Sequence, residues 1–310
     1  MKCRRCKAPA LIDVRRHNAA FCAECFAHHC REQVRRAIDG FDMIHPGERV
    51  LVAVSGGKDS LGIWDLLVDL GYECDGLYLG LGIGEYSIAS GRYARVFAAS
   101  RGLRLVEVDI PEEYGFDIET AATTVRRSPC GACGLSKRHL FNHHALAGGY
   151  DVVVTGHNLD DEAGVLLGNV LRWDAPYLGR QYPVLPAAPG FVRKVKPLVR
   201  LSEREMAAYC VMRGIDYIVD ECPMAEGNRH LAYKEALNAL EQRSPGAKAN
   251  FLFGFLERGH ERFAGDAAEE RAGLVACAVC GSPTTGEVCA FCRMGERVRH
   301  GAAPAPPRSH

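Results

Sequence analysis

The sequence lacks any apolar run that approaches the roughly 18 residues needed to cross a bilayer. It also lacks an apolar stretch behind its first residue, where the string MKCRRCKAP places cysteines and basic residues instead. A secretory signal peptide requires such a stretch. We therefore expect a cytoplasmic protein that has no membrane segment.

The sequence has no net charge either, because 38 Lys and Arg balance 38 Asp and Glu. This balance, taken alone, argues against a nucleic-acid partner. The basic residues are unevenly distributed, however. Residues 1–40 hold nine Lys or Arg against four acids, and a second basic stretch comprises Arg193, Lys194, Lys196 and Arg200. Local basic patches attract phosphate backbones, although ordinary solvated surface is an equally good interpretation.

Cysteine, in contrast, is abundant, with 14 residues. Ten of them form five Cys-x-x-Cys pairs: Cys3/Cys6, Cys22/Cys25, Cys130/Cys133, Cys277/Cys280 and Cys289/Cys292. A disulfide framework is typical of short secreted chains, which this chain does not resemble. The pairs therefore favour metal binding.

The pattern of residues predicts four segments along the chain. Residues 1–30 form a cysteine module from which a basic helix leads out, and residues 31–265 form the catalytic domain. Residues 274–297 form a second cysteine module. The Ala- and Pro-rich end, residues 298–310, is typical of a disordered tail.

The catalytic domain alternates β-rich runs with helical patterns. Strands are predicted at residues 49–54, 76–81, 104–108, 151–155 and 216–218. Helices are predicted at residues 61–70, 87–101, 136–147, 158–171 and 202–213. This alternation predicts an α/β fold with a doubly wound, Rossmann-like parallel sheet, flanked by the two cysteine modules. Ligands then bind at the carboxyl ends of the strands.

The string SGGKDS, residues 55–60, lies between the first predicted strand and its helix. Its two glycines let the backbone approach an anion, and the helix N-terminus directs free N–H groups toward it. Ser60 can bond a phosphate oxygen, and Lys58 supplies positive charge. The spacing is not that of the Walker motif. The alternative interpretation is a tight turn with an N-capping serine.

SGGKDS resembles the PP-loop of the N-type ATP pyrophosphatases, which cleave ATP to AMP and pyrophosphate while they adenylate a carbonyl oxygen. The resemblance implies that backbone groups near Ala53 and Leu79 hold the adenine. Gly156 matches the second turn that contacts ATP in this superfamily. The residues of the loop that would hold the phosphates are Ser55, Gly56, Gly57, Lys58, Asp59 and Ser60.

Cys130 and Cys133, in the string SPCGACG, have no second Cys-x-x-Cys pair nearby. A structural zinc site requires four ligands. Three thiolates, from these two residues and Cys222, suit a [4Fe–4S] cluster that leaves one iron open. On spacing alone, a redox disulfide or a zinc site completed by Cys210 or a histidine remains an alternative.

Several motifs together resemble the tRNA two-thiolation family of the TtcA/TtuA type, over nearly the whole chain. They are the terminal cysteine modules, SGGKDS, PCGACG, GHNLDDE at residues 156–162 and ECP at residues 221–223. The cysteine modules at both ends and the string LGIGEYS, residues 81–87, favour the TtuA branch. That branch thiolates uridine or 5-methyluridine at position 54 in the T-loop of tRNA.

This resemblance implies both the ligands and the partners of the protein. It implies a [4Fe–4S] cluster on Cys130, Cys133 and Cys222, and a functional polar pair formed by Lys137 and Asp161. It also implies that sulfur comes from a ubiquitin-like carrier protein ending in a thiocarboxylate, and that the enzyme is a homodimer.

The implied reaction has two steps. With ATP and Mg²⁺ on the loop, the C2 carbonyl oxygen of the uridine attacks the α-phosphorus, and sulfur then displaces AMP. Lys58 and Lys137 are the candidate cations for the charge that develops, and Lys137 would also contact ATP. Asp161 is a candidate base or Mg²⁺ ligand. The alternative is an acidic first helical turn without a catalytic role, which we favour for Asp160 and Glu162.

Two groups of four cysteines have the spacing of tetrahedral zinc sites, so we expect two Zn²⁺ ions. The groups are Cys3, Cys6, Cys22 and Cys25, and Cys277, Cys280, Cys289 and Cys292. One hypothesis is that the first module contacts tRNA phosphates through Arg4, Arg5, Lys7, Arg15 and Arg16. The alternative is that each metal only stabilises a fold too small for a core.

Three alternative functions deserve comparison. Enzymes that perform the same chemistry on wobble uridine 34 or cytidine 32 share the central motifs. Only the terminal modules and residues 81–87 argue against these substrates. A zinc-ribbon RNA-binding protein without catalysis is disfavoured by the intact Lys58, Asp59 and Lys137. An amide-forming pyrophosphatase would require neither a cluster nor a sulfur carrier.

Overall fold

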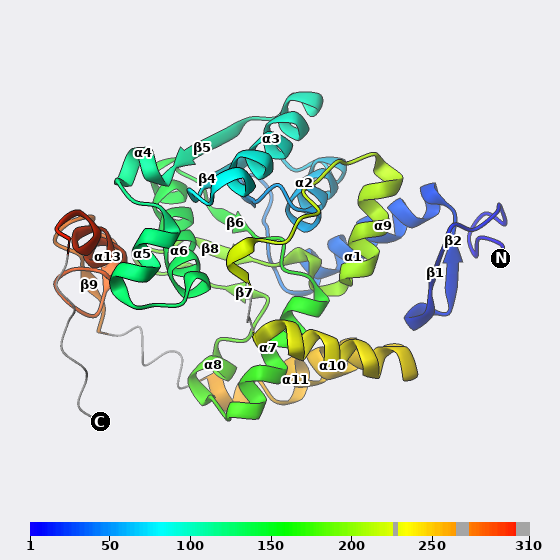
Figure 1. The fold of residues 1–310 in the computed structure, drawn as a ribbon. Coiled ribbons are helices and arrows are strands. Elements are labelled where there is room, and N and C mark those ends of the chain that lie inside the picture. The colour runs from blue at the N-terminus through cyan, green and yellow to red at the C-terminus, as the bar shows by residue number, and fades with distance from the viewer. Residues whose placement is uncertain (226–228, 265–272, 302–310) are drawn as a thin grey trace.

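The computed structural model describes residues 1–225, 229–264 and 273–301. A central sheet lies between helices, with the N-terminal hairpin at one end of the molecule and the C-terminal cysteine module at the other (Figure 1). No helix in the described ranges is long and apolar enough to span a bilayer. The predicted domain boundary at residue 265 lies outside the described residues, and so does the part of the predicted tail, residues 298–310, that follows residue 301.

The sheet has six strands in the order β5-β4-β3-β6-β8-β7, and all but the edge strand β7 are parallel to their neighbours. The strands are β3 (Val50–Val54), β4 (Cys74–Gly80), β5 (Leu105–Asp109), β6 (Val152–Val154), β7 (Val184–Leu185) and β8 (Arg193–Val195). From β3 the chain first winds outward through β4 to β5, and it then returns to β6 on the other side. The predicted doubly wound α/β sheet is thus confirmed, and its switch point lies between β3 and β6.

Both faces of the sheet are covered, because alternate side chains of β3 enter different core clusters. Val50, Val52 and Val54 belong to one cluster and Leu51 to the other. The first face is covered by α1 (Ala23–Gly40), α2 (Lys58–Asp69), α3 (Gly84–Arg101) and α9 (Glu203–Arg213). The second is covered by α4 (Ile110–Tyr114), α5 (Ile118–Val125), α6 (Pro129–Ala147) and α13 (Ala290–Arg299).

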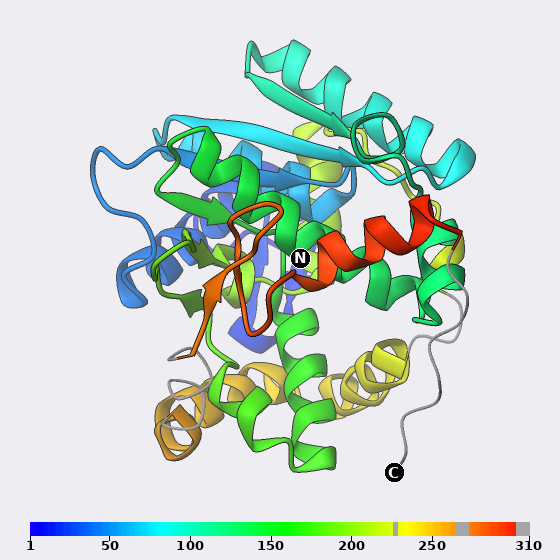
Figure 2. The same ribbon diagram turned by 90° about the vertical axis from the view of Figure 1, so that its left-hand side faces the viewer.

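A further group of helices packs below the sheet, as Figures 1 and 2 show. It consists of α7 (Leu159–Arg172), α8 (Ala175–Gly179), α10 (Arg229–Arg243) and α11 (Ala247–Arg258). Both α10 and α11 contact α7. The sequence pattern did not predict α10 and α11.

The terminal modules are small and contain little regular structure. In the first, β1 (Ile12–Val14) and β2 (Ala19–Phe21) form an antiparallel hairpin that leads into α1. In the second, β9 (Val275–Ala276) pairs with β10 (Pro283–Thr284), and α13 packs against α5 and α6. Figure 2 shows α13, in red, in front of the sheet. The division of the chain into four segments remains a prediction.

The predicted strand at residues 216–218 is wrong. This segment has no strand conformation, and the Ile218 N–H donates to the Gly56 carbonyl oxygen at 3.0 Å, so it lies against the phosphate loop instead of joining the sheet. The position beside β6 is taken by β8, in which Arg193 is the register partner of Val152. The sequence pattern did not indicate β8 because two of its three residues are basic.

The second basic stretch is engaged in internal contacts. Arg193 contacts Glu48, Lys196 Nζ lies 2.8 Å from Glu162, and the Arg200 guanidinium lies 4.8 Å from the centre of the Phe253 ring. Lys194 Nζ donates to the Arg138 carbonyl oxygen at 3.4 Å. These residues therefore hold β8 and its surroundings together and do not form a free phosphate-binding patch.

Candidate active site

The phosphate loop, residues 55–60, connects β3 to α2 and has a closely packed, internally bonded conformation. Gly56 has φ +75°, and a Cβ there would lie 2.2 Å from the Ser90 carbonyl oxygen of α3. Ser60 Oγ accepts from the Ser55 N–H at 3.0 Å and from the Ser55 hydroxyl at 3.1 Å, and it donates to the Gly57 carbonyl oxygen at 2.9 Å. The loop thus directs the N-terminus of α2 toward the carboxyl edge of the sheet, where an anion can bind.

Lys58 of this loop is paired with carboxylates. Its Nζ lies 2.9 Å from Glu203 and 3.1 Å from Asp59. Burial lowers the pKa of Lys58, but the two carboxylates outweigh this effect and raise the pKa above its usual value. Burial raises the pKa of Asp59 to about 6, against the opposing effect of Lys58. Lys58 is therefore a cation that is already neutralised by its neighbours.

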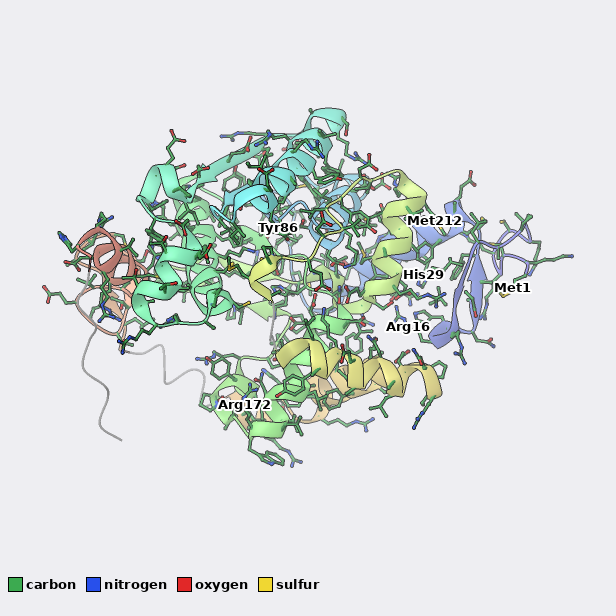
Figure 3. All side chains as sticks on the ribbon, in the orientation of Figure 1. Met1, Arg16, His29, Tyr86, Arg172 and Met212 are labelled. Atoms are coloured by element: carbon green, nitrogen blue, oxygen red, sulfur yellow. The ribbon has the colours of Figure 1, made fainter. Side chains whose placement is uncertain are left out.

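A cavity of about 280 Å³ lies beside the loop at the carboxyl edge of the sheet. It brings together seven residues predicted to bind ATP: Ala53, Ser55, Asp59, Ser60, Leu79, Lys137 and Gly156. Tyr86, labelled in Figure 3, is one of its aromatic lining residues. Gly57 and Lys58 instead line a larger neighbouring cleft of about 800 Å³, which shares Asp59 with the cavity. Gly56 lies beneath α3.

The turn after β6 forms the opposite wall of the cavity. A Cβ on Gly156 would lie 2.9 Å from backbone atoms of Asp59 and Ser60, so only glycine fits this contact. Asn158 then caps α7, because its Oδ1 accepts from the Asp160 N–H at 2.9 Å and the Asp161 N–H at 3.1 Å. Its Nδ2 donates to Asp59 at 3.1 Å, which ties the two walls together.

Asp161 is half-buried, and both of its carboxylate oxygens have partners. Oδ2 accepts from the Asn158 N–H at 3.0 Å and completes a capping box, while Oδ1 lies 2.5 Å from Lys234 Nζ. Its neighbours Asp160 and Glu162 are buried in ion pairs with other lysines. None of these three carboxylates lines the cavity, and Asp160 lines the neighbouring cleft that contains Lys58. Asp161 lies close to the loop, because its charge, after burial, contributes to the raised pKa of Asp59.

Helix α6 carries three predicted site residues. It begins at Pro129 because Ser128 caps it, accepting from the Gly131 N–H at 3.2 Å, and so it starts seven residues before the predicted position 136. Cys130 and Cys133 therefore lie in its first turns, and Lys137 lies one turn further on, in the cavity wall. Within the described residues, the Lys137 ammonium makes no hydrogen bond or ion pair.

Cys222 joins the two cysteines of α6 from a distant part of the chain. The 3₁₀ turn behind it, η3 (Pro223–Ala225), packs against α6, and Cys130 Sγ donates to the Met224 carbonyl oxygen at 3.4 Å. Burial, and then the nearby Cys133 and Cys222, raise the pKa of Cys130. The structure thus places the segment that carries Cys222 against the N-terminal part of α6, which carries Cys130 and Cys133.

The alternative in which Cys210 completes a zinc site here is wrong. Cys210 is fully buried in the core cluster on the other face of the sheet, and its Sγ donates to the Lys58 carbonyl oxygen at 3.3 Å. Cys133 and Cys222 pack against the opposite cluster.

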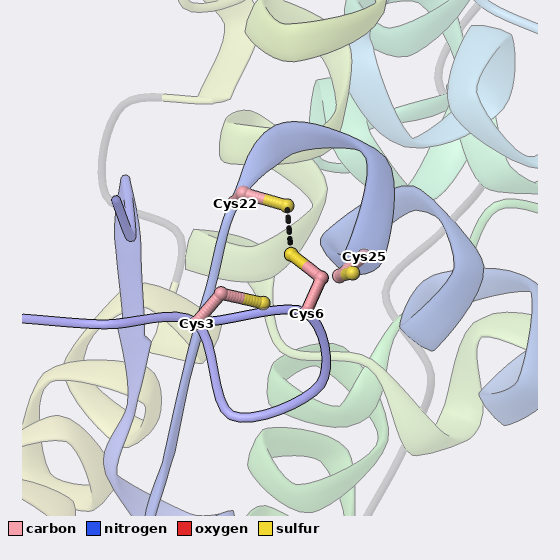
Figure 4. Close-up of side chains that lie close together, drawn as sticks. All are labelled: Cys3, Cys6, Cys22 and Cys25. Carbon is pink, nitrogen blue, oxygen red and sulfur yellow. Dashed lines mark hydrogen bonds between the residues drawn. The ribbon is translucent and has the colours of Figure 1, made fainter. Parts of the chain in front are cut away.

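The two terminal groups of cysteines are compact. Within each group the four sulfurs lie within 4.8 Å of one another. Figure 4 shows the first group, in which Cys6 Sγ and Cys22 Sγ are 3.5 Å apart. In the second group, Cys280 Sγ and Cys289 Sγ are 3.7 Å apart. Such closeness suits four thiolates around one ion.

Backbone N–H groups also point at these sulfurs, as a thiolate requires. Cys277 Sγ accepts from the N–H of Val279 at 3.4 Å and of Cys289 at 3.2 Å. Although burial opposes it, this bonding lowers the pKa of Cys277 to about 6. Hydrogen bonds from the Cys6 backbone likewise lower the pKa of Cys3 to about 6. The donor sets therefore fit a structural metal ion.

The three central cysteines form no group of this closeness among the described residues. A multi-iron cluster is larger than one ion, so it suits cysteines that are more widely spaced.

His17, His29 and Glu205 form another close group, between the N-terminal hairpin and α9 (Figure 3). Arg16 Nη2 already donates to both Glu205 oxygens, at 2.9 and 2.8 Å. The positive Arg16 guanidinium excludes a metal ion from this group. The group therefore joins the N-terminal module to α9 by an ion pair. Arg16 is therefore an internal contact and unavailable as the tRNA-binding residue that its position in the sequence indicated.

Two residues of the site were missed by sequence reasoning. Glu203 binds Lys58, and Lys234 binds both Glu203, at 3.3 Å, and Asp161. The string Ser202-x-x-Glu205 indicates the start of α9, but no local pattern marks Glu203 as a partner of the loop. Lys234 lies in a helix that was not predicted.

Comparisons with known proteins agree with this geometry. A family model described as the N-terminal LIM domain of 2-thiouridine synthetase TtuA matches residues 2–27. A tRNA-5-methyluridine(54) 2-sulfurtransferase of Thermus thermophilus is 51% identical over 96% of this chain and 92% of its own length. The Pyrococcus horikoshii protein of the same name is 41% identical over 95% of this chain and 93% of its own.

A solved structure matches over the full length. It is the U34-tRNA thiolase NcsA from Methanococcus maripaludis with its [4Fe-4S] cluster, which superimposes with a TM-score of 0.79 at 26% identity and covers 100% of this chain and 99% of that one. The resemblance inferred from the motifs is confirmed, and the chain belongs to the tRNA-5-methyluridine(54) 2-sulfurtransferase family.

Proposed function

We propose that this chain uses ATP to replace the C2 oxygen of uridine or 5-methyluridine 54 in tRNA by sulfur. The observation that carries the proposal is the position of Lys137, which lines the cavity beside the phosphate loop and shares helix α6 with Cys130 and Cys133. This one helix would connect the nucleotide to the thiols, as the reaction requires. Three relatives that are 40–51% identical carry the name of the position-54 enzyme.

ATP would occupy the cavity and the loop together. Backbone groups at Ala53 and Leu79 would hold the adenine at one end of the cavity. The phosphates would extend past Asp59 toward Gly57 and Lys58, where the N-terminus of α2 favours anions. Mg²⁺, held with the help of Asp161, would neutralise part of the phosphate charge.

Cys130, Cys133 and Cys222 would hold a [4Fe–4S] cluster. They offer three thiols from two segments, and the solved relative contains a cluster of this kind. When bound, the cluster would supply an iron with an open coordination position for sulfur. The free ammonium of Lys137 would lie between this group and the nucleotide.

The lysines and the loop would carry the first step. When the C2 carbonyl oxygen of the uridine attacks the α-phosphorus and pyrophosphate leaves, negative charge develops on phosphate oxygens, and Lys137 and Lys58 would stabilise it. Addition of sulfur at C2 then breaks the C2–O bond, and AMP leaves with that oxygen. Asp161, beside the loop, would hold Mg²⁺ or the turn that carries Asn158.

The remaining partners follow from the same proposal. Each terminal group of four cysteines would bind one Zn²⁺, and the basic residues of the first module other than Arg16 would contact tRNA phosphates. A ubiquitin-like thiocarboxylate protein would deliver the sulfur. We further propose that the enzyme is a homodimer and works in the cytoplasm.

The test is an assay on unmodified tRNA. The protein is purified without oxygen, reconstituted with iron and sulfide, and incubated with ATP, sulfide and tRNA, and the thiolated base is mapped. We expect thiolation at position 54 with equal amounts of AMP and pyrophosphate. Lys137→Ala should abolish the thiolation of tRNA and the release of AMP and pyrophosphate. Arg138→Ala, which changes an exposed cation on the same helix, should not. Thiolation at another base would contradict the proposal. So would a protein that retains its cluster but thiolates no base.

A further inference from the structure

An alternating row of five charged side chains runs along the edge of the phosphate site. From one end to the other it consists of Asp59, Lys58, Glu203, Lys234 and Asp161. The successive N–O distances are 3.1, 2.9, 3.3 and 2.5 Å. The row connects a lysine of the phosphate loop to the acidic residue at the start of α7, and two of its members, Glu203 and Lys234, have no role in the function proposed above.

The packing of α10 on α7 brings Lys234 to this place. A Cβ on Gly164 of α7 would lie 3.3 Å from Lys234 Cγ, and a Cβ on Gly168 would lie 2.6 Å from the Tyr233 ring. The two glycines therefore let α10 approach α7 closely. Because Gly164 lies about one turn beyond Asp161, the Lys234 stem crosses the glycine and its ammonium reaches the carboxylate.

Glu203 is held just as firmly. It is the first residue of α9, and its N–H donates to Asp160 Oδ2 at 2.9 Å. The other oxygen of Asp160 contacts the buried Lys248. Glu203 can therefore change its side-chain partners without moving its backbone.

The charges of the row do not cancel, since three carboxylates face two ammonium groups. A polyphosphate that arrives at the loop would be repelled by any further negative charge. Burial raises the pKa of Glu203, but Lys58 and Lys234 outweigh it and lower that pKa, so the carboxylate stays ionised. Without Lys234 the row would present two net negative charges to the phosphates instead of one.

We propose that Lys234 and Glu203 are positioning residues of the sulfurtransferase, acting through Lys58 and Asp161. Glu203 holds the Lys58 ammonium at the mouth of the loop until phosphate oxygens replace it, and Lys234 then neutralises the released Glu203 together with Asp161. This inference rests on the proposed use of ATP and assigns the residues that prepare the site for it.

Three substitutions separate charge from packing. Lys234→Met keeps the aliphatic stem that covers Gly164 but removes the ammonium, Lys234→Arg keeps a cation, and Glu203→Gln removes the carboxylate charge. Arg243→Ala, at an exposed position of the same helix, is the control. ATP affinity is measured by calorimetry, and kcat and KM for ATP are measured by pyrophosphate release with tRNA.

We expect Lys234→Met to raise the Kd and KM for ATP and to lower kcat, each by about tenfold, because a misplaced reacting group costs at least that much. Lys234→Arg should recover most of the loss, and Glu203→Gln should lower kcat more than it changes the Kd.

If Lys234→Met has the Kd, KM and kcat of the wild type, the inference is overturned, since packing alone would then explain Lys234. If the wild type binds ATP without thiolating position 54, the proposed function fails, whereas a weaker Kd in Lys234→Met still supports the positioning role. A wild type that does not bind ATP overturns both.

Discussion

At the scale of single residues, the phosphate site depends on two glycines and on what surrounds one lysine. Gly56 and Gly156 are glycines because backbone atoms of other elements occupy the space of a side chain. The motif SGGKDS predicted a close approach of the backbone to an anion at Gly56, but it did not predict the packing of α3 against this glycine. It could not predict that Lys58 pairs with Glu203, because that partner lies 145 residues away in the sequence and its position depends on how α9 packs.

Gly56 gives the first prediction. Gly56→Ala should both destabilise the fold and weaken ATP binding, because the new Cβ must displace the Ser90 carbonyl of α3. Gly71→Ala is the matched control, since Gly71 has a similar φ of +87° with nothing within 4 Å of its Cβ position. We expect Gly71→Ala to cost about 1–2 kcal/mol of unfolding free energy from backbone strain alone. Gly56→Ala should cost about 1–3 kcal/mol more.

Urea denaturation and ATP titration measure the two effects. ATP affinity should be unchanged in Gly71→Ala and at least about tenfold lower in Gly56→Ala. Equal behaviour of the two variants would contradict the close packing of α3 on the loop.

At the scale of elements, the sequence predicted the sheet from its edge strand β5 to the buried β6 and missed the two strands at the other edge, β8 and β7. The runs that became β3 and β6 are β-branched and entirely buried, so their pattern is unambiguous. Strand β8 has only Val195 as an apolar residue, and its basic side chains are paired with distant groups. The apolar residues near Ile218 resemble a strand, yet they cover the phosphate loop. Tertiary contacts, which no local pattern records, decided both cases.

The N-terminal module packs against α9, and this contact predicts how the free energy of unfolding depends on pH. Burial raises the pKa of Glu205, but His29, Arg16 and Ser202 outweigh it and lower that pKa to about 2. A carboxyl group whose pKa falls from 4.5 to about 2 on folding stabilises the folded state fully above pH 4.5. This stabilisation, about 3 kcal/mol at most, is lost as the pH falls toward 2.

Glu205→Gln should therefore unfold more easily than wild type at pH 7, and the difference should shrink as the pH falls below 4.5. The measurement is the unfolding free energy of both proteins at several pH values with zinc present, so that any acid release of zinc affects both alike. A difference that stays constant from pH 7 to pH 3 would show that the carboxylate charge does not hold the module.

At the scale of the whole molecule, the two cysteine modules lie at opposite ends of the catalytic sheet (Figure 1). The cysteine spacings predicted both modules, because ligand spacing is a local property. The sequence could not tell which basic residues of the first module face solvent, and the structure removes Arg16 from that set.

The exposed members of the set predict a salt-dependent contact with tRNA. Arg5 and Arg15 are exposed, so the double change Arg5→Ala/Arg15→Ala should weaken tRNA binding without changing ATP affinity. We expect about a tenfold higher Kd and a salt slope that is smaller by about 1–2, since each lost phosphate contact removes nearly one unit. Filter binding over a range of salt concentrations measures both quantities. An unchanged slope would assign the tRNA contact to another surface.

The central claim is that the cysteines beside the nucleotide cavity take part in the chemistry, and one comparison tests it most directly. Wild type, the triple variant Cys130→Ala/Cys133→Ala/Cys222→Ala and the core variant Cys210→Ala are purified and reconstituted without oxygen. Iron, zinc and 2-thiolation at position 54 are then measured in each. We predict about four irons and two zincs in wild type and Cys210→Ala, with thiolation in both. The triple variant should keep its zinc and its ATP affinity but lose iron and thiolation. A triple variant that thiolates tRNA as well as wild type would contradict the account.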